Sequence, residues 1–123
     1  MMEIIPSADD VIALMIAHKI VGTDLDAIMD RLDGAMARHD KVHVFVETRS
    51  IDGIEIAGLG SCMKRALPLF GKLDRFGRVT VVADQGWIRA ATKIESALLP
   101  QISYRVFEPE DRDEALAWVM GET

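Results

Sequence analysis

The sequence feature that most constrains the fold is an alternation between two patterns of hydrophobic residues. Short runs rich in β-branched residues occur at 42–46, 79–83 and 102–107, and such runs are typical of strands inside a sheet. Between these runs, apolar residues recur every three or four positions, as they do on one face of a helix. Parallel neighbouring strands need connections long enough to hold a helix, so this order predicts an α/β fold whose later strands form a parallel sheet.

The first part of the chain departs from this alternation. Residues 3–5 form a short apolar run that Pro6 stops, and turn residues then lead into the apolar run 11–17, so we expect a β-hairpin. A helix that continues to Arg38 follows, with Thr23 as its expected N-cap. The strand 42–46 should then end, because the next four residues are all polar.

Three further helices are expected in the rest of the chain. The first runs from Ile54 to about Leu69 and is disrupted near its end by Pro68. The next ends before Pro100 and carries a stripe of apolar residues along one face, of which Trp87 is interpreted first as a core residue and second as an interface anchor. The members of that stripe are Trp87, Ala90, Ala91, Ile94 and Leu98. The last helix follows 108–110 and ends at Gly121, with Trp118 also interpreted as a core residue.

Composition limits the class of protein. Half of the 123 residues are hydrophobic, so we expect residues 1–123 to form a single domain with a substantial core. The formal net charge of −6 disfavours nucleic-acid binding, because a polyanion would be repelled. No basic leader opens the chain, and no apolar run approaches the roughly 20 residues of a membrane span. We therefore expect a cytoplasmic protein without stable membrane insertion.

Candidate catalytic and metal-binding residues are few. His18, His39 and His43 have no spacing that would hold a metal ion. Cys62 is the single cysteine, so it has no intramolecular disulfide partner, and a buried thiol is the favoured interpretation. The acids that follow the strand 42–46 are interpreted as solvated loop carboxylates: Glu47, Asp52 and Glu55. We therefore expect no catalytic residue, no metal, no cofactor and no enzymatic activity.

Two segments carry a resemblance to a known family. The ending Arg105-Val106-Phe107-Glu108-Pro109-Glu110-Asp111, continued by Ala115-Leu116-Ala117-Trp118-Val119, and the segment 42–60 resemble the SpoIIAA-like branch of the STAS superfamily. The resemblance covers essentially the whole chain. It implies a mixed four- or five-stranded sheet with an N-terminal hairpin, then parallel β/α units, and four helices.

The resemblance implies two different functions. One is regulation of a protein partner, as in anti-sigma-factor antagonists, and the other is binding of an apolar ligand, as in the related CRAL-TRIO-type lipid-binding domains. In the antagonists, the helix after the strand begins with Asp-Ser-Ser/Thr-Gly-Leu-Gly, and its serine is phosphorylated. Here Ile56 and Ala57 occupy the two hydroxyl positions before Gly58-Leu59-Gly60, so we expect that switch to be absent. Ser61 is a nearby hydroxyl that stays open as a phosphorylation site.

Apolar groups at this helix start point toward ligand binding. Open α/β sheets bind ligands at the carboxyl ends of their strands, so we expect an apolar mouth there. Its candidate residues are Ile54, Ile56, Ala57, Gly58, Leu59 and Met63. The alternative is that these side chains pack on the sheet and that the glycines allow close helix packing.

A run of positive residues offers a second contact for a lipid. Its members are Lys64, Arg65, Lys72, Arg75 and Arg78, which would meet lipid phosphates or simply keep the surface soluble. We expect a binding module for a lipid or other apolar small molecule. The alternative is a protein-interaction domain without phosphorylation control, acting as a homodimer or with a protein partner.

Overall fold

Within residues 1–121, which are the residues that the computed structural model describes apart from the side chain of Phe70, the chain forms a five-stranded sheet. The strands lie side by side in their order along the chain: β1 (Met2–Ile4), β2 (Val11–Ile20), β3 (Val42–Ile54), β4 (Phe76–Ala83) and β5 (Ser103–Phe107). β1 is antiparallel to β2, and all other neighbours are parallel. The predicted hairpin, parallel β/α units and mixed sheet are confirmed.

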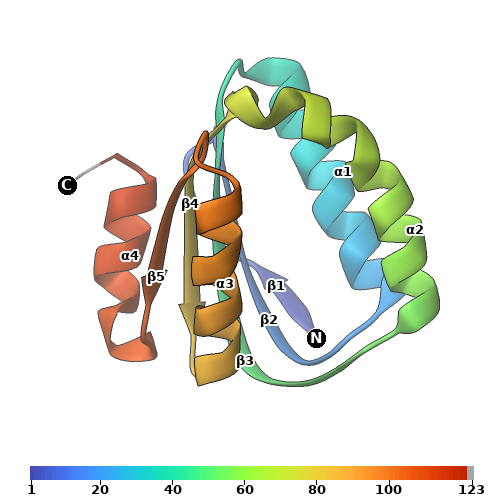
Figure 1. Cartoon of the computed structure of the whole chain (residues 1–123), viewed down its shortest axis with the longest axis vertical. Helices are drawn as coiled ribbons and strands as arrows, with labels where there is room; N and C mark the ends of the chain where they lie inside the picture. Colours follow the sequence, from blue (N-terminus) through green and yellow to red (C-terminus); the bar gives the residue numbers. More distant parts are fainter. Residues whose placement is uncertain (122–123) are drawn as a thin grey trace.

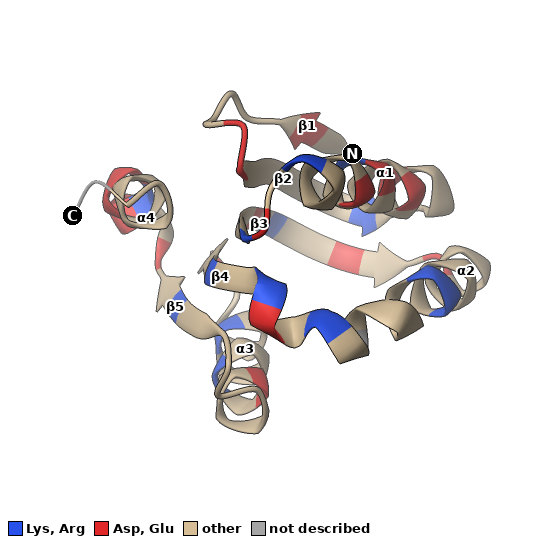
Figure 2. Ribbon diagram, turned by 90° about the horizontal axis from the view of Figure 1, so that it is seen from above, with Lys and Arg blue, Asp and Glu red and all other residues tan. Residues whose placement is uncertain are grey.

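Helices cover both faces of this sheet (Figure 1). The helices are α1 (Gly22–Arg38), α2 (Ile56–Ala66), α3 (Gly86–Leu98) and α4 (Arg112–Val119), with 3-10 segments η1 (Leu67–Arg75) and η2 (Pro109–Asp111). Viewed from above, α4 lies on one side of the sheet, whereas α1, α2 and α3 lie on the other (Figure 2). The last turn of the predicted second helix is the 3-10 segment η1, in agreement with the expected effect of Pro68.

Two hydrophobic clusters hold these layers together. On the first face, Ile12 and Leu14 of β2 pack with Met29 and Leu32 of α1. On the second face, Ala13 of β2 joins the cluster that α4 covers. Side chains alternate between the faces of a strand, so residues 11–17 of β2 are buried on both sides and form an uninterrupted apolar run.

The third strand is longer than its sequence predicts. The prediction that the polar residues after Val46 end it is wrong, because β3 continues to Ile54. Two of these polar residues have partners that are distant in sequence, whereas the buried Thr48 hydroxyl has no hydrogen-bond partner among the described residues. Glu47 binds Arg112, and the Ser50 N–H donates to both carboxylate oxygens of Asp84, at 3.1 and 3.0 Å. These contacts satisfy polar groups inside the sheet that a local pattern assigns to a loop.

The first helix begins earlier than expected. The prediction of Thr23 as N-cap is wrong, because α1 starts at Gly22 after Val21. Two carboxylates accept the unpaired N–H groups of this helix start. Asp24 accepts from the Val21 N–H at 3.4 Å, and Glu55 accepts from the Gly22 N–H at 3.0 Å. A carboxylate that follows the neighbouring strand β3, 33 residues along the chain, therefore does part of the work expected of a threonine hydroxyl.

Strands β2 and β3 extend beyond the rest of the sheet. The last β3–β4 pair is Thr48 with Ala83, whereas β2 and β3 stay paired as far as Ile20 and Ile54. The extension begins where His18 and Ser50 have left-handed backbone conformations, with φ of 60° and 50°. Figure 1 shows this two-stranded extension curving away from β4 toward the first turns of α1 and α2. As a result, α2 packs on α1 and buries none of its own residues.

Candidate functional site: an apolar cleft between α2 and α3

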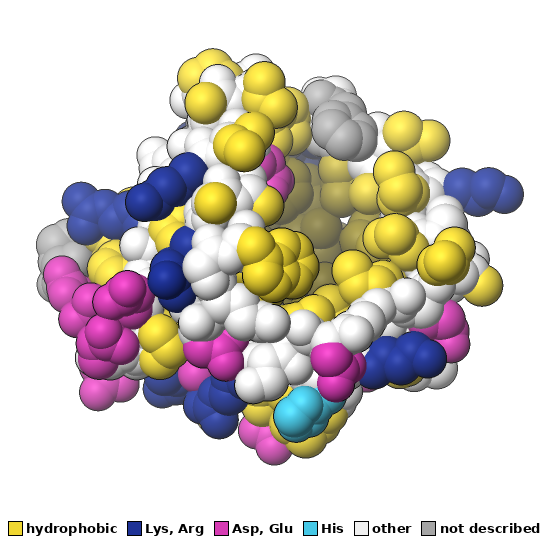
Figure 3. Space-filling view, turned by 60° about the horizontal axis from the view of Figure 1, so that its bottom comes forward, with side chains coloured by type: hydrophobic (Ala, Val, Ile, Leu, Met, Phe, Trp, Pro, Cys, Tyr) yellow, Lys and Arg dark blue, Asp and Glu magenta, His cyan; other side chains and the backbone are white. Residues whose placement is uncertain are grey.

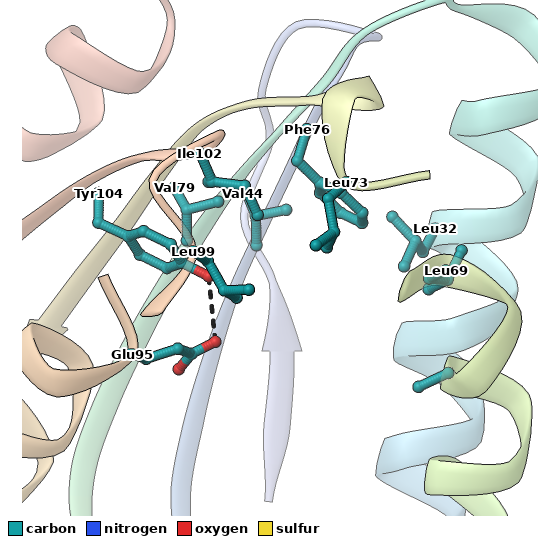
Figure 4. A pocket seen from close by; sticks show the side chains of 11 residues that line it. Leu32, Val44, Leu69, Leu73, Phe76, Val79, Glu95, Leu99, Ile102 and Tyr104 are labelled. Carbon is teal, nitrogen blue, oxygen red and sulfur yellow. Dashed lines mark hydrogen bonds between the residues drawn. The ribbon is translucent and has the colours of Figure 1, made fainter. Parts of the chain in front are cut away.

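A cavity of about 320 Å³ lies over the sheet, between α1 and α2 on one side and α3 on the other (Figure 4). Its volume falls within the range of roughly 300–1,000 Å³ that is usual for small-molecule sites. The lining residues come from α1, β3, α2, η1, β4, α3 and β5: Leu32, Val44, Ala66, Leu69, Leu73, Phe76, Val79, Glu95, Leu99, Ile102 and Tyr104. Figure 4 shows most of these side chains converging on one space from both sides.

Apolar side chains are exposed along α2 and at its C-cap, Leu67. Ile56 is 84% exposed, and Met63 and Leu67 are also exposed. Arg65 lies on the flank of α2 that pairs with α1, through Asp30 and Asp33 at 2.9 Å each. On a helix, residues three and four apart lie side by side, so Met63 neighbours Ala66 on the opposite flank, where the cavity lies.

The facing helix α3 carries a matching stripe. Trp87, Ile94 and Leu98 are exposed, Leu98 by 74%, so the interpretation of Trp87 as a core residue is wrong. Leu98 lies three residues after Glu95, which lines the cavity. Figure 3 shows hydrophobic side chains on both sides of a hollow and across its floor. An apolar stripe in the sequence indicates that one face of the helix is apolar, but not what covers that face. In this protein the face borders an open cleft.

None of the predicted mouth residues lines the cavity, which lies toward the amino ends of β3 and β4, at Val44 and Val79, and meets α2 at its last residue, Ala66. Ile54 ends β3, and Ile56, Ala57 and Leu59 are exposed in the first turn and a half of α2. Gly58 differs from its neighbours in packing against Gly22 of α1, which matches the alternative of close helix packing. Nothing lies within 4 Å of a β-carbon built on Gly60. Sequence reasoning located the helix but missed the cavity.

Two polar side chains line the cavity, and both were overlooked. The Tyr104 hydroxyl donates a hydrogen bond to Glu95 Oε1 at 3.0 Å, which is the dashed line in Figure 4. Burial raises the pKa of Tyr104, and the neighbouring charge of Glu95 raises it further. The phenol therefore stays protonated and keeps donating to Glu95. A tyrosine among apolar strand residues is the one signal in the sequence that could have indicated this position.

A second polar cluster lies on the opposite face of the sheet. Glu47 is buried and accepts from Arg112 Nε at 2.7 Å and from Arg49 Nε at 2.9 Å. Burial raises the pKa of Glu47, but the hydrogen bonds from Arg112 and Arg49 outweigh burial and the pKa is lowered. The interpretation of Glu47 as a solvated loop acid is wrong. The cluster joins α4 to β3, because Arg112 also lies over the Phe45 ring, 5.9 Å from its centroid.

The histidines are spread over different parts of the fold. His43 is buried, its Nδ1 accepts from the Arg78 N–H at 2.8 Å, and its pKa is lowered by burial and by Arg78. His39 pairs with Asp9 at 2.8 Å on the surface. Within residues 1–121, no three His, Cys, Asp or Glu side chains are grouped as metal ligands would be.

The sheet order, the covering helices and the apolar cleft define a small α/β domain of the regulatory or binding class. The chain belongs to the SpoIIAA-like family, whose model matches residues 11–120. Its structure is similar to that of an uncharacterized protein of the DUF3478 family with a SpoIIAA-like fold, from Shewanella loihica PV-4. The TM-score is 0.70 at 23% sequence identity, over 97% of this chain and 92% of the other.

A search of curated proteins gives no match to this chain. Among the helices of residues 1–121, none combines the length and the apolar character needed to cross a membrane.

Proposed function

We propose that this domain is a non-enzymatic binding module that holds a lipid or another apolar small molecule in the cleft between α2 and α3. The observation that carries the proposal is a concave cavity whose walls continue into exposed apolar stripes on both helices. Burying a large apolar side chain contributes about 1.5–3 kcal/mol relative to leaving it exposed. A ligand that covers Met63 and Leu98 would gain part of that free energy.

The proposed site extends from the cavity to the predicted mouth. Ile54, Ile56, Ala57, Leu59 and Met63 form the apolar lip at the start of α2, where a bound chain would leave the cavity. Gly58 holds the start of α2 in place through its packing against Gly22 of α1. Apolar lining with few polar groups is the usual composition of small-molecule sites.

A binding role without catalysis also fits the groups around the cavity. Its titratable side chains are Glu95 and Tyr104, and they bond to each other. The raised pKa of Tyr104 makes its phenol a poor nucleophile near neutral pH, and among the residues that line the cavity no third titratable side chain orients the pair. We therefore propose no reaction for this site and assign it no cofactor.

A second candidate is a protein-interaction domain that lacks phosphorylation control. It is favoured by the exposed apolar area itself, since contiguous apolar patches often mark protein interfaces. Ile56 and Ala57 occupy the positions of the expected hydroxyls, and Ser61 is exposed further along α2. Under this proposal a second copy of the chain or another protein would cover the cleft.

Binding of a neutral fluorescent probe, N-phenyl-1-naphthylamine, tests the leading proposal. We expect one probe per chain and at least about tenfold weaker binding in Val79→Phe, a change of about 1.4 kcal/mol, because the ring fills the cavity. Thermal melting checks that the variant stays folded. Unchanged probe binding in a folded variant would remove the cavity from the proposal.

Native mass spectrometry of the freshly purified protein separates the two candidates. A co-purifying small molecule, released from the Val79→Phe variant, supports the first. A homodimer that dissociates when Leu98 is changed to Glu supports the second, because that side chain is exposed in the single chain and would be buried only in an assembly.

A further inference from the structure

The polar groups of the cavity are confined to one end. Of the eleven residues that line it, nine are apolar, and Glu95 and Tyr104 alone carry polar side-chain atoms. Figure 4 shows this pair at the α3–β5 end, whereas Leu32 and Leu69 lie at the far end beside α1 and η1. An amphipathic ligand would therefore place its polar group near Glu95 and its apolar part toward Leu69.

The pair has unused hydrogen-bond acceptors and no unused donor. A phenol has one O–H, and Tyr104 uses it on Glu95 Oε1 at 3.0 Å. The second carboxylate oxygen and the lone pairs of the phenol oxygen can only accept. Among the described residues, no Lys, Arg or His nitrogen lies within 4.0 Å of the Glu95 carboxylate. This end of the cavity is thus negative, and a ligand can bind to it only through a hydrogen-bond donor.

The arginines of the positive run pair with groups outside the cavity. Arg65 binds Asp30 and Asp33. Arg75 donates to the backbone carbonyls of Asp40 and His39. None of the residues in the positive run 64–78 that we expected to meet lipid phosphates lines the cavity with a charged group.

Strand alternation gives the same result for the last strand. Tyr104 faces the cavity, and Arg105, the next residue of β5, faces the other side of the sheet, 4.9 Å from the Trp118 ring centroid. The third arginine of the run, Arg78, donates to the Val119 carbonyl of α4 at 3.1 Å. Among the described residues that line the cavity, none offers a positive partner to an anionic head group.

Resting on the proposed function, we infer that the cleft selects apolar molecules whose polar end is a hydrogen-bond donor, a hydroxyl or an ammonium, and discriminates against carboxylates. A donor end would complete the free acceptors of Glu95 and Tyr104. A carboxylate end would place a second negative charge beside Glu95 without a donor between them. Because Glu95 is exposed to solvent, water and salt screen this repulsion, and the discrimination is moderate.

Competition against N-phenyl-1-naphthylamine tests the inference with three ligands of equal chain length: dodecanol, dodecylamine and dodecanoate. The measurement is made at about pH 8 and low salt, where carboxylates are ionised. For the unmodified protein we expect dodecanol and dodecylamine to bind about three- to tenfold more tightly than dodecanoate, the size of one hydrogen bond. Comparing the two donor ligands separates charge from hydrogen bonding. Both can donate a hydrogen bond, but only the ammonium of dodecylamine is also attracted by the negative charge of Glu95.

Variants identify the groups responsible. Glu95→Gln should bring dodecanol and dodecanoate to within about twofold, because the amide offers a donor and removes the charge. Glu114→Gln on α4 is the matched control, since it makes the same charge change on an exposed residue of the opposite face and should preserve the preference.

The outcomes separate this inference from the proposed function. If the probe binds and Val79→Phe blocks it, but dodecanoate competes as well as dodecanol, the cleft binds apolar molecules and the inference about the head group is wrong. An unchanged preference in Glu95→Gln also overturns the inference. If the probe does not bind the cleft at all, the proposed function fails first.

Discussion

Gly22 at the start of α1 and Gly58 in the first turn of α2 bring two helix backbones into direct contact. A β-carbon on Gly22 would lie 3.2 Å from the Cα of Gly58 and 2.8 Å from Glu55 Oε1, the atom that caps α1. Glycine is therefore required here for close approach. The contact fixes α2 against α1 instead of the sheet, and that placement leaves the cleft beside α3 open.

This contact predicts a strong difference between two glycines of one helix. Gly58→Ala should lower the free energy of unfolding by about 1–3 kcal/mol, because the backbones of α1 and α2 must separate. Gly60→Ala is the matched control. Its β-carbon meets open space, so it should raise the stability by up to about 1 kcal/mol through helix propensity. Urea denaturation measures both, and equal effects would contradict the packing role.

The buried carboxylate of Glu47 predicts a pH dependence of stability. Arg112 and Arg49 lower its pKa despite burial, so the folded state holds the Glu47 proton less tightly than the unfolded state does. The resulting stabilisation is present above the unfolded value, near 4.5, and is lost as the pH falls through the lowered folded pKa.

The variant Glu47→Gln isolates this contribution. It should lower the stability at neutral pH by about 1.5–3 kcal/mol, because hydrogen bonds to charged groups have that strength. It should also have a flatter stability profile than the unmodified protein at acid pH. Chemical denaturation at a series of pH values measures both effects, and parallel profiles would show that Glu47 does not titrate as described.

The start of α2 predicts an effect on ligand uptake without an effect on folding. Met63→Asp adds a charge on the flank beside Ala66, so binding of N-phenyl-1-naphthylamine should weaken about three- to tenfold, and Ile56→Asp should weaken it less. Ser61→Asp is the control, since it adds the same charge to an exposed position of the same helix. Equal binding in all three variants would remove the lip from the site.

The two tryptophans should report ligand binding differently. Trp87 is exposed on the α3 stripe, whereas Trp118 is half-buried beneath Arg105 on the other face. Dodecanol should therefore shift the emission of the Trp118→Phe variant to shorter wavelength and leave that of Trp87→Phe unchanged. A shift confined to the Trp87→Phe variant would place the ligand on the α4 face.

Much of the fold can be predicted from local patterns. The β-branched run 42–46 and the helical stripe from Leu25 to Met36 depend on contacts between near neighbours in sequence, and both elements occur where they are expected. The boundaries that fail, at Thr23 and after Val46, fail for a shared reason. Polar groups at these boundaries have partners far away along the chain. The Gly22 N–H bonds to Glu55, the Ser50 N–H to Asp84, and the Glu47 carboxylate to Arg112.

The sequence by itself determined the order of strands and helices and the apolar character of each helix face, because periodicity is a local property of a chain. Only the tertiary structure decided which apolar faces are covered. The stripe of α1 is buried, and the stripes that contain Met63 and Leu98 are open. The Gly22–Gly58 contact directs α2 onto α1, which leaves the space between α2 and α3 uncovered. The apolar stripe of a helix supplies only one surface of a packing contact. Which segment supplies the other surface depends on how parts of the chain that are distant in sequence pack together.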